Sequence, residues 1–345
     1  MAAAPAHHLS ARWLSALVSA VALLFGLAPP AAADAPRELT LGVFAPTLPL
    51  LAADRLGFFA EEGLAVTFAQ VTSSTQQFGS LRSGEYDLAL TSPDNVANYR
   101  LNTGNALGER LPVTGIVGSD AGMNLVLATV PGIGAPEELR GTSVAVDAPD
   151  SGFAYVLYAM LSEHGLERDA DYQVVPVGGI PLRFQALLAG EQQAALLSNG
   201  FEARAVAQGL RVFDGVRDVA DPYLGTVFAA LEPWLKRHRQ DALAFTRAYL
   251  KALRWSLDPA NREQALTLLT AALPDTDRAL AEEIYRVHLD PGIGLIPDGD
   301  VSTAAMRNIL LLRQRFDGFD EPQNLRRLAT EGGGLYTREF LRRAR

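Results

Sequence analysis

The sequence predicts an α/β protein built from two similar lobes that are joined by a two-strand hinge. The chain has 345 residues, of which 48% are hydrophobic and 20% are charged, so it has enough apolar side chains for two cores. A strand–helix–strand–helix–strand pattern occurs twice, and each occurrence predicts a parallel sheet covered by helices. Apolar segments between and after the two patterns provide strands on which the chain can cross between lobes.

The first pattern lies within residues 39–95. Its expected elements are a buried strand at 39–44, a helix at 50–62, a strand at 65–71, a helix ended by Gly84 and a strand at 86–90. Polar loops follow two of these strands, at 72–75 and 91–95. This order predicts the first lobe.

The second pattern repeats the first within residues 142–200. It predicts a strand at 142–146, a helix at 152–163, a strand at 172–177, a helix at 181–189 and a strand at 193–197. The dipeptides between elements correspond, because Gly63-Leu64 matches Gly165-Leu166 and Gly84-Glu85 matches Gly190-Glu191. The alternative is a single doubly wound sheet with chance similarity, which the matched spacing disfavours.

Two further strands are expected to connect the lobes. One lies at 123–130, and the other, at 224–231, returns to the first lobe after a helix at 201–208 and a strand at 210–213. The rest is mostly helical, with helices expected at 234–257, 262–272, 276–288 and 302–316. Lobe one is therefore predicted at 34–127 and 215–345, and lobe two at 128–214. Two crossing strands form a hinge that permits closure by rotation.

Residues 1–33 have the features of a cleavable export signal. Arg12 precedes an uncharged apolar run at 13–28, which prolines break before the small residues Ala31–Ala33. A membrane anchor is the alternative, but about 16 apolar residues are fewer than the ~20 that a spanning helix needs. We expect cleavage after Ala33 and a periplasmic mature protein.

Composition excludes several classes of function. The net charge of −9 argues against nucleic-acid partners and anionic membranes, and removal of Arg12 leaves 29 basic against 39 acidic residues, or −10. The absence of cysteine excludes disulfides, cysteine-ligated metals, thiol nucleophiles and a lipoprotein anchor. The five histidines show no metal-ligand spacing, and no P-loop or nucleophile elbow occurs. We therefore expect no metal, no cofactor and no enzymatic activity.

Ligands of open parallel sheets bind beyond the carboxyl ends of the strands, where helix N-termini present free N–H groups. The loops expected there are rich in hydroxyl residues, glycine and proline. The candidate ligand-binding residues are Phe44, Pro46, Thr47, Ser73, Ser74, Thr75, Ser92, Asp94 and Asn95 in lobe one, and Asp150, Ser151, Gly152, Phe153, Gly179, Arg183, Ser198 and Asn199 in lobe two.

Each candidate also has a purely structural interpretation. Ser73, Thr75, Ser151 and Asp94 are residue types that cap helices, and Phe153 is a residue type that packs in cores. Arg183 stands in the first turn of a helix, where the dipole disfavours a cation, and this position makes it a candidate anion contact.

Several strings make the chain similar to a known family. They are LLAADRLGFFAEEGL at 50–64, LRSGEYDLA at 81–89, ELRGTSVAV at 138–146, LLAG at 187–190 and AVAQGL at 205–210. With the leader and the duplicated lobes, these strings resemble the sulfonate-, nitrate-, taurine- and thiamine-precursor-pyrimidine-binding components of ABC importers. The resemblance implies a periplasmic-binding-protein type II fold and delivery of a small molecule to a permease in the inner membrane. We expect a monomer.

The chain departs from the family pattern in ways that affect the ligand. Asp87 keeps an acidic residue that the family carries in lobe one, but Gln193 replaces its counterpart in lobe two. Carboxylates at Asp94 and Asp150 favour an organic ligand with amine or ring N–H donors, such as a pyrimidine-like or other heteroaromatic compound. A sulfonate is the alternative if Arg183 points inward.

Two other functions remain open. One is an enzyme of the same fold acting on a pyrimidine-type compound, although the only lysines are Lys236 and Lys251, too late in the chain for the lobe-one loops. The other is a sensor component that presents its ligand to a receptor.

Overall fold

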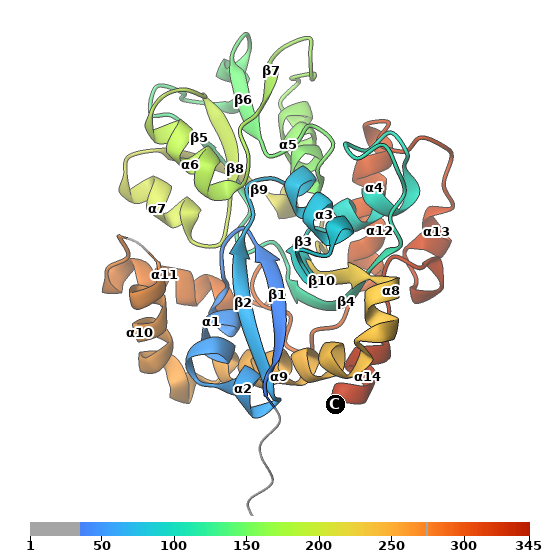
Figure 1. The fold of residues 1–345 in the computed structure, drawn as a ribbon. Coiled ribbons are helices and arrows are strands. Elements are labelled where there is room, and N and C mark those ends of the chain that lie inside the picture. Colours follow the sequence, from blue (N-terminus) through green and yellow to red (C-terminus); the bar gives the residue numbers. More distant parts are fainter. Residues whose placement is uncertain (1–34, 274) are drawn as a thin grey trace, which may run out of the picture. The chain divides into compact units, whose positions relative to one another are not determined.

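The computed structural model describes residues 35–273 and 275–345, of which residues 36–345 form one compact unit. The expected leader at 1–33 and its cleavage after Ala33 lie outside the described residues. Figure 1 shows two sheets with helices packed around them, and the chain passes twice from one sheet to the other. Within the described ranges, no helix is long and apolar enough to cross a lipid bilayer.

The first sheet has the strand order β2-β1-β3-β10-β4. β1 pairs in parallel with β2 and β3, whereas β10 runs antiparallel between β3 and β4. The strands are β1 (Arg37–Val43), β2 (Leu64–Gln70), β3 (Leu88–Thr91), β4 (Val113–Asp120) and β10 (Thr226–Leu231). A strand that follows the whole second sheet in the sequence, β10, therefore lies inside the first sheet.

The second sheet repeats this arrangement in the order β7-β6-β8-β5-β9. β6 pairs in parallel with β7 and β8, and β5 runs antiparallel between β8 and β9. The strands are β5 (Val126–Thr129), β6 (Ser143–Val146), β7 (Gln173–Pro176), β8 (Ala194–Leu197) and β9 (Arg211–Gly215). The prediction of two similar α/β lobes is confirmed, but each sheet is mixed and not parallel, because a strand that adjoins a crossing between the lobes runs antiparallel within it.

The crossings lie at 121–125 and 216–225, slightly away from the predicted lobe boundaries. The strand predicted at 123–130 starts only at Val126, because Met123 and Asn124 adopt positive φ angles of 47° and 57° that an extended strand cannot contain. The predicted boundary at residue 127 therefore falls inside β5, and the boundary at 215 falls on the last residue of β9.

Fourteen α-helices are described, and two predicted helices are each divided in two. Gly57, at φ 77°, interrupts the helix predicted at 50–62, and His238 separates the two helices found within 232–257. The helices are α1 (Leu48–Arg55), α2 (Phe58–Glu61), α3 (Ser74–Ser83), α4 (Pro93–Leu101), α5 (Gly152–Glu163), α6 (Ile180–Leu188), α7 (Phe201–Ala207), α8 (Glu232–Arg237), α9 (Arg239–Leu257), α10 (Arg262–Ala272), α11 (Arg278–Leu289), α12 (Thr303–Arg315), α13 (Leu325–Leu328) and α14 (Glu339–Ala344).

Serines begin three of the helices at the junction of the lobes. The hydroxyl of Ser73 accepts from the third residue of α3, Ser92 caps α4, and Ser151 caps α5. The interpretation of Ser73 and Ser151 as caps is thus correct. Asp94 is not the cap of α4, because Ser92 precedes Pro93 and takes that position.

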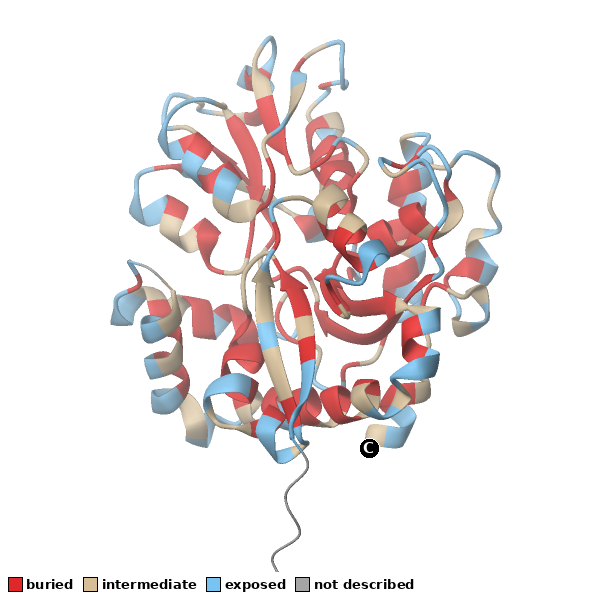
Figure 2. Cartoon of the chain, viewed as in Figure 1, coloured by how far each residue is buried: buried red, intermediate tan, exposed pale blue. Residues whose placement is uncertain are grey.

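The core beneath the first sheet is aromatic and centres on α9. Phe245 stacks on Phe59 at a centroid distance of 5.6 Å and meets the edge of Phe228 on β10 at 5.0 Å. Figure 2 shows buried residues along the strands and on the helix faces turned toward them. Truncation of a buried aromatic residue such as Phe245 costs about 3–5 kcal/mol, so this packing fixes the sheet on which the site is built.

Helix α12 packs against both lobes. It contacts α4, which follows β3 of the first sheet, and α5, which follows β6 of the second (Figure 1). The C-terminal part of the chain therefore spans the junction beside the hinge.

Candidate functional site

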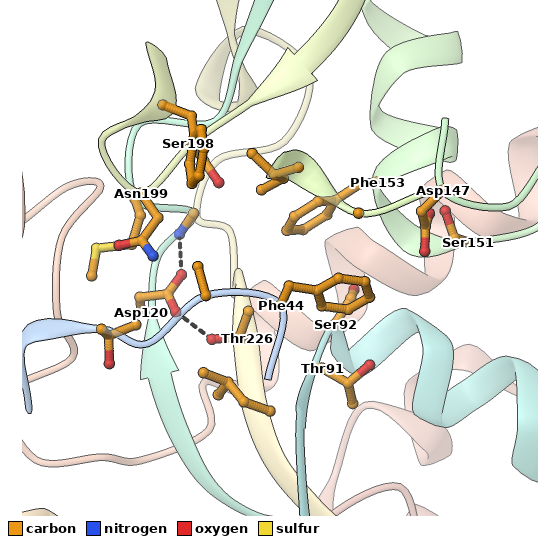
Figure 3. A pocket seen from close by; sticks show the side chains of 18 of the residues that line it. Phe44, Thr91, Ser92, Asp120, Asp147, Ser151, Phe153, Ser198, Asn199 and Thr226 are labelled. Atoms are coloured by element: carbon orange, nitrogen blue, oxygen red, sulfur yellow. Dashed lines mark hydrogen bonds between the residues drawn. The ribbon is translucent and has the colours of Figure 1, made fainter. Parts of the chain in front are cut away.

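A cavity of about 80 Å³ lies between the two lobes, at the carboxyl ends of β1, β3, β4, β6 and β8 (Figure 3). This edge is where open α/β sheets place their ligands. Its lining comes from both lobes and comprises Phe44, Ala45, Thr47, Leu90, Thr91, Ser92, Asn95, Asp120, Gly122, Met123, Asp147, Ser151, Phe153, Gly179, Ile180, Arg183, Ser198, Asn199, Phe201 and Thr226.

Aromatic side chains form much of the wall. Figure 3 shows the rings of Phe44 and Phe153 in the middle of the cavity lining, one from each lobe. Phe44 follows β1, and its ring lies directly on Gly179 of lobe two, where an added Cβ would come within 2.4 Å of Cδ1. The absence of a side chain at Gly179 therefore lets an aromatic residue of one lobe pack against the backbone of the other.

Arg183 supplies a buried cation to the cavity. Its side chain lies on α6, and the residue is only 2% exposed. Nε and Nη2 donate to the carbonyl of Leu196 at 3.3 and 3.0 Å, and Nη1 donates to the carbonyl of Gly178 at 3.2 Å. No carboxylate of the described residues lies within 4.0 Å of the guanidinium. Two of its five N–H groups are therefore left for another acceptor.

Burial also acts on the protonation of Arg183. It lowers the pKa of this guanidinium, and the more distant charge of Asp147 only partly opposes that effect. An arginine keeps its proton even so, and the cavity therefore holds a positive charge that lacks a close counter-charge.

Asp120 places a carboxyl group at the hinge end of the cavity. Oδ1 accepts from the backbone N–H of Gly122 at 2.9 Å, and Oδ2 accepts from the hydroxyl of Thr226 (Figure 3). A Cβ on Gly225 would lie 2.1 Å from Oδ1, so only glycine fits there. Burial raises the pKa of Asp120, although these hydrogen bonds oppose the rise. The carboxyl group links the first crossing segment to the start of β10, directly after the second crossing segment, and Asp120 also lines the cavity.

Asp147 carries the third charged group of the cavity. It follows β6, and its Oδ2 accepts from the backbone N–H of Ser74 in lobe one at 3.1 Å. Two other hydrogen bonds cross between the lobes nearby. Gly152 N donates to Asn95 Oδ1 at 2.9 Å, and Gly179 N donates to the carbonyl of Thr72 at 2.7 Å. The structure is therefore a closed form, with the lobes in direct contact around the cavity.

Hydroxyl and amide groups complete the lining. Thr47 precedes α1 without capping it, and its buried Oγ1 has no hydrogen-bond partner among the described residues. Asn199 follows β8 with a φ of 54°, and this turn brings Ser198 and Asn199 to the cavity (Figure 3). An unpartnered hydroxyl in the lining of the same cavity is a suitable donor for a bound anion.

Ten of the predicted site residues line this cavity. They are Phe44, Thr47, Ser92, Asn95, Ser151, Phe153, Gly179, Arg183, Ser198 and Asn199. The other seven do not. Ser73 caps α3, Ser74 and Thr75 form its first turn, Gly152 packs against Ser92, and Pro46 lies between two lining residues without joining them.

Asp94 and Asp150 are the main corrections to the predicted site, because their polar partners are protein groups outside the cavity. Asp94 is 2% exposed and forms an ion pair with Arg313 of α12, whose Nη2 lies 2.6 Å from Oδ1. The carboxylate of Asp150 accepts from Asn98 Nδ2 at 2.7 Å. In this structure both carboxylates are therefore bound by protein groups, and neither residue lines the cavity.

Ten lining residues were not predicted. They are Ala45, Leu90, Thr91, Asp120, Gly122, Met123, Asp147, Ile180, Phe201 and Thr226. Ala45, Thr91 and Ile180 adjoin a predicted residue, and Asp147 precedes the predicted residues Asp150 and Ser151 in the same loop. Asp120 had no such signal, because β4, which it ends, was not recognised.

Comparisons with known proteins agree with this architecture. A model of the NMT1-like family matches residues 32–270. The periplasmic nitrate-binding protein NrtA from Synechocystis PCC 6803 superposes with a TM-score of 0.74 at 14% identity, covering 90% of this chain and 88% of that one. A protein from Bordetella bronchiseptica gives a TM-score of 0.72 at 20% identity, with 89% and 96% covered.

A third solved structure is the alkanesulfonate-binding protein SsuA from Xanthomonas axonopodis pv. citri bound to MOPS. It gives a TM-score of 0.66 at 14% identity and covers 90% of this chain and 99% of that one. No curated protein sequence matches the chain. These likenesses establish the periplasmic-binding-protein fold that the sequence predicted.

Proposed function

The chain belongs to the NMT1-like family, and from this premise we propose that it is an exported solute-binding protein that captures a small molecule between its lobes and delivers it to an ABC importer. The support is a cavity lined by both lobes, together with a fold shared with proteins named for binding nitrate and alkanesulfonates. The expected leader places the protein in the periplasm, and its partner is a permease in the inner membrane. The protein acts as a monomer.

The buried cation of Arg183 carries the proposal for the ligand. A buried charge without a counter-ion costs folding free energy, and a bound anion would remove that cost. The cavity of about 80 Å³ is roughly half the ~150 Å³ apolar cavity that accommodates benzene, so the closed form suits a compact solute. We therefore favour a small organic anion, such as a short sulfonate, over a bulky ligand.

The remaining groups of the cavity would contact the rest of the ligand. Phe44 and Phe153 would contact its apolar part. Asp120 and Asp147 would accept hydrogen bonds from an N–H or O–H group, the role first assigned to Asp94 and Asp150. A pyrimidine-like or other heteroaromatic compound is the alternative ligand, and it requires the lobes to close less tightly than they do here.

Capture follows from contacts made to both lobes. Arg183 and Ser151 belong to lobe two, whereas Phe44 and Thr47 belong to lobe one, so a ligand that touches all of them stabilises the closed form. At a concentration about 100 times its Kd, such a ligand raises the free energy of unfolding by about 2.7 kcal/mol. The permease would recognise the closed form.

A binding role is also favoured over catalysis by the position of the lysines. Lys251 contacts Glu61 and the ring of Phe58, away from the cavity, and Lys236 belongs to α8. Neither lines the cavity. The role of a sensor component would use the same cavity, and the identity of the docking partner distinguishes it from transport.

The test is a ligand screen followed by calorimetry. A thermal-shift screen of short sulfonates, nitrate, taurine, pyrimidines and aromatic acids should give a positive shift, largest for a compact sulfonate. Titration calorimetry should then show affinity about a hundredfold weaker for Arg183→Gln, because the variant loses the charge facing the anion. Arg211→Gln, which removes an exposed arginine of lobe two, is the matched control.

Two results would contradict the proposal at different levels. Binding of a neutral pyrimidine with equal affinity by the wild type and Arg183→Gln would overturn the anion but keep the solute-binding role. If no compound shifts the melting temperature, and mass spectrometry finds nothing bound to the purified protein, the solute-binding role itself loses its support.

A further inference from the structure

A second polar cluster joins the lobes outside the ligand cavity. It is formed by Asp94 and Asn98 on α4, Arg313 on α12, and Asp150, which lies in the loop before α5 of lobe two. None of these four residues lines the cavity. They adjoin it nonetheless, because Ser92 and Asn95 of the same helix N-terminus, and Ser151 of the same loop, do line it.

Arg313 is the centre of this cluster, and its side chain is 0% exposed. Nε donates to Asp94 at 3.0 Å and Nη2 donates to Asp94 Oδ1 at 2.6 Å, which holds the guanidinium on lobe one. Nη1 donates to Asn98 Oδ1 at 3.1 Å and to the carbonyl of Gly318 at 2.6 Å. The donor that remains, on Nη2, reaches the carbonyl of Asp150 at 2.7 Å, so all five N–H groups have an acceptor.

Lobe two contributes three groups to the cluster. The first is the Asp150 carbonyl, and the second is the Asp150 carboxylate, which accepts from Asn98 Nδ2 at 2.7 Å. The third is the ring of Tyr155, whose centroid lies 4.6 Å from Arg313 Cζ. Charge-assisted hydrogen bonds and cation–π contacts are strong when they are shielded from water. Opening the lobes would have to break all of these contacts.

We infer that Arg313, Asn98 and Asp150 form a latch that favours the closed form, so that residues without ligand contact help to set the ligand affinity. The part of this inference that concerns ligand affinity rests on the proposed function. The apparent Kd of a ligand that binds the closed form equals its intrinsic Kd divided by the closed fraction. Weakening the latch should therefore lower the closed fraction and raise the apparent Kd in the same proportion.

The experiment measures the distance between the lobes in the ligand-free protein. Because the chain has no cysteine, Leu188→Cys on α6 and Gln264→Cys on α10 give unique attachment points for a fluorophore pair. Both residues are exposed, and Figure 1 shows their helices in different lobes. The latch variants are Asp150→Ala, which removes only the carboxylate, and Arg313→Lys, which keeps the charge beside Asp94. Their controls are Glu191→Ala and Arg307→Lys, at exposed positions in lobe two and on α12.

Both latch variants should shift the ligand-free distance distribution toward larger separations, whereas the controls leave it unchanged. The apparent Kd should rise about tenfold for Asp150→Ala, and saturating ligand should restore the closed distance. An unchanged distribution in a folded Asp150→Ala protein would overturn the latch while leaving solute binding intact. If the variants open but no ligand is ever found, the latch stands and the proposed function fails.

Discussion

Two buried arginines at the junction of the lobes differ in what surrounds them. Arg313 and Arg183 are 0% and 2% exposed, so both charges are removed from water. Arg313 has an acceptor for every N–H group, including both oxygens of Asp94. Arg183 donates to two backbone carbonyls and has no carboxylate within 4.0 Å among the described residues. The charge of Arg313 is compensated by a carboxylate, whereas the partners of Arg183 within the described part of the chain are backbone carbonyls, and in our proposal a ligand supplies its counter-charge.

This difference separates a structural charge from one available for binding. Burial acts against the charge of Arg313, but Asp94 outweighs it and raises the pKa of the guanidinium above its usual value. For Arg183 burial is the main influence and lowers its pKa. Ionisable groups whose pKa is perturbed by burial in a cleft are concentrated at functional sites, and this makes Arg183 a candidate for ligand binding. The same reasoning explains why Asp94, a predicted ligand contact, is bound to Arg313 and does not line the cavity.

The largest effect is expected from removing the compensated arginine. Arg313→Met leaves the buried carboxylate of Asp94 without its partner, so the free energy of unfolding should fall by about 3–5 kcal/mol. Chemical denaturation of the ligand-free protein measures this loss. The double variant Asp94→Asn/Arg313→Met should recover part of it, because no unpaired charge remains. If the double variant were less stable by the sum of the two single losses, the ion pair would not be the source of the effect.

A buried carboxyl group gives the next largest effect, through pH. Glu202 on α7 is 3% exposed, and its Oε2 has no hydrogen-bond partner among the described residues. Burial raises its pKa to about 7, with the charge of Glu283 acting in the same direction. Below about pH 4.5 both the folded and unfolded states hold the proton. As the pH rises from 4.5 through 7, the unfolded state releases the proton of Glu202 before the folded state does. The free energy of unfolding therefore falls over this range.

The expected loss is about 3 kcal/mol between pH 4.5 and pH 8. Glu202→Gln should abolish it, so the variant and the wild type should have similar free energies of unfolding at pH 4.5 and diverge as the pH rises. Taking the difference between the two proteins at each pH removes the contributions of other groups, among them His288, whose pKa burial lowers to about 4. Parallel pH curves for the two proteins would exclude Glu202 as a buried titrating group.

Replacement of Arg183 should have the opposite balance of effects to replacement of Arg313, with little change in stability and a large change in ligand affinity. Arg183→Met removes a buried charge that no carboxylate neutralises, so the ligand-free protein should keep its stability or gain about 1 kcal/mol. Its affinity for an anionic ligand should fall about a hundredfold. Denaturation and calorimetry on the same preparation measure the two effects. A loss of stability as large as that of Arg313→Met would mean that Arg183 is also a structural charge.

The fold was largely predictable because its signals are local. The glycines that end the helices, and the matched strand–helix spacing of the two patterns, can be read within about ten residues of each element. One strand was missed, since β4 contains Thr114, Gly115, Gly118 and Ser119 among its apolar residues, and yet it is buried throughout. Asp120, at its end, was missed with it.

The candidate site was predictable only in its loops. The carboxyl ends of parallel strands meet at one edge, and this rule placed Ser92, Ser151 and Ser198 at the cavity. It could not distinguish Asp94 from Asp147. The partner of Asp94 is Arg313, which lies 219 residues away in the chain, and no local sequence pattern predicts such an ion pair. Whether the lining residues bind a ligand stays a prediction.

The smallest expected effect concerns the close contact between the two lobes at Gly152. Gly152, at the start of α5, touches lobe one so closely that an added Cβ would lie 2.4 Å from Ser92 Oγ and 2.7 Å from Asp94 Cβ. Because its φ is not positive, alanine fits the backbone at this first position of α5, and the clash disappears when the lobes separate. Gly152→Ala should therefore leave the ligand-free melting temperature nearly unchanged.

Its ligand affinity should nevertheless fall, by about fivefold, because the new methyl group keeps the lobes from closing fully and the closed fraction decreases. Gly132→Ala in lobe two, where an added Cβ meets nothing within 4 Å, is the matched control for both measurements. Lower stability together with unchanged affinity would show that the contact supports the fold and not closure. The predicted combination, with stability kept and affinity reduced, would locate the effect in the step by which the lobes come together around the cavity of Arg183.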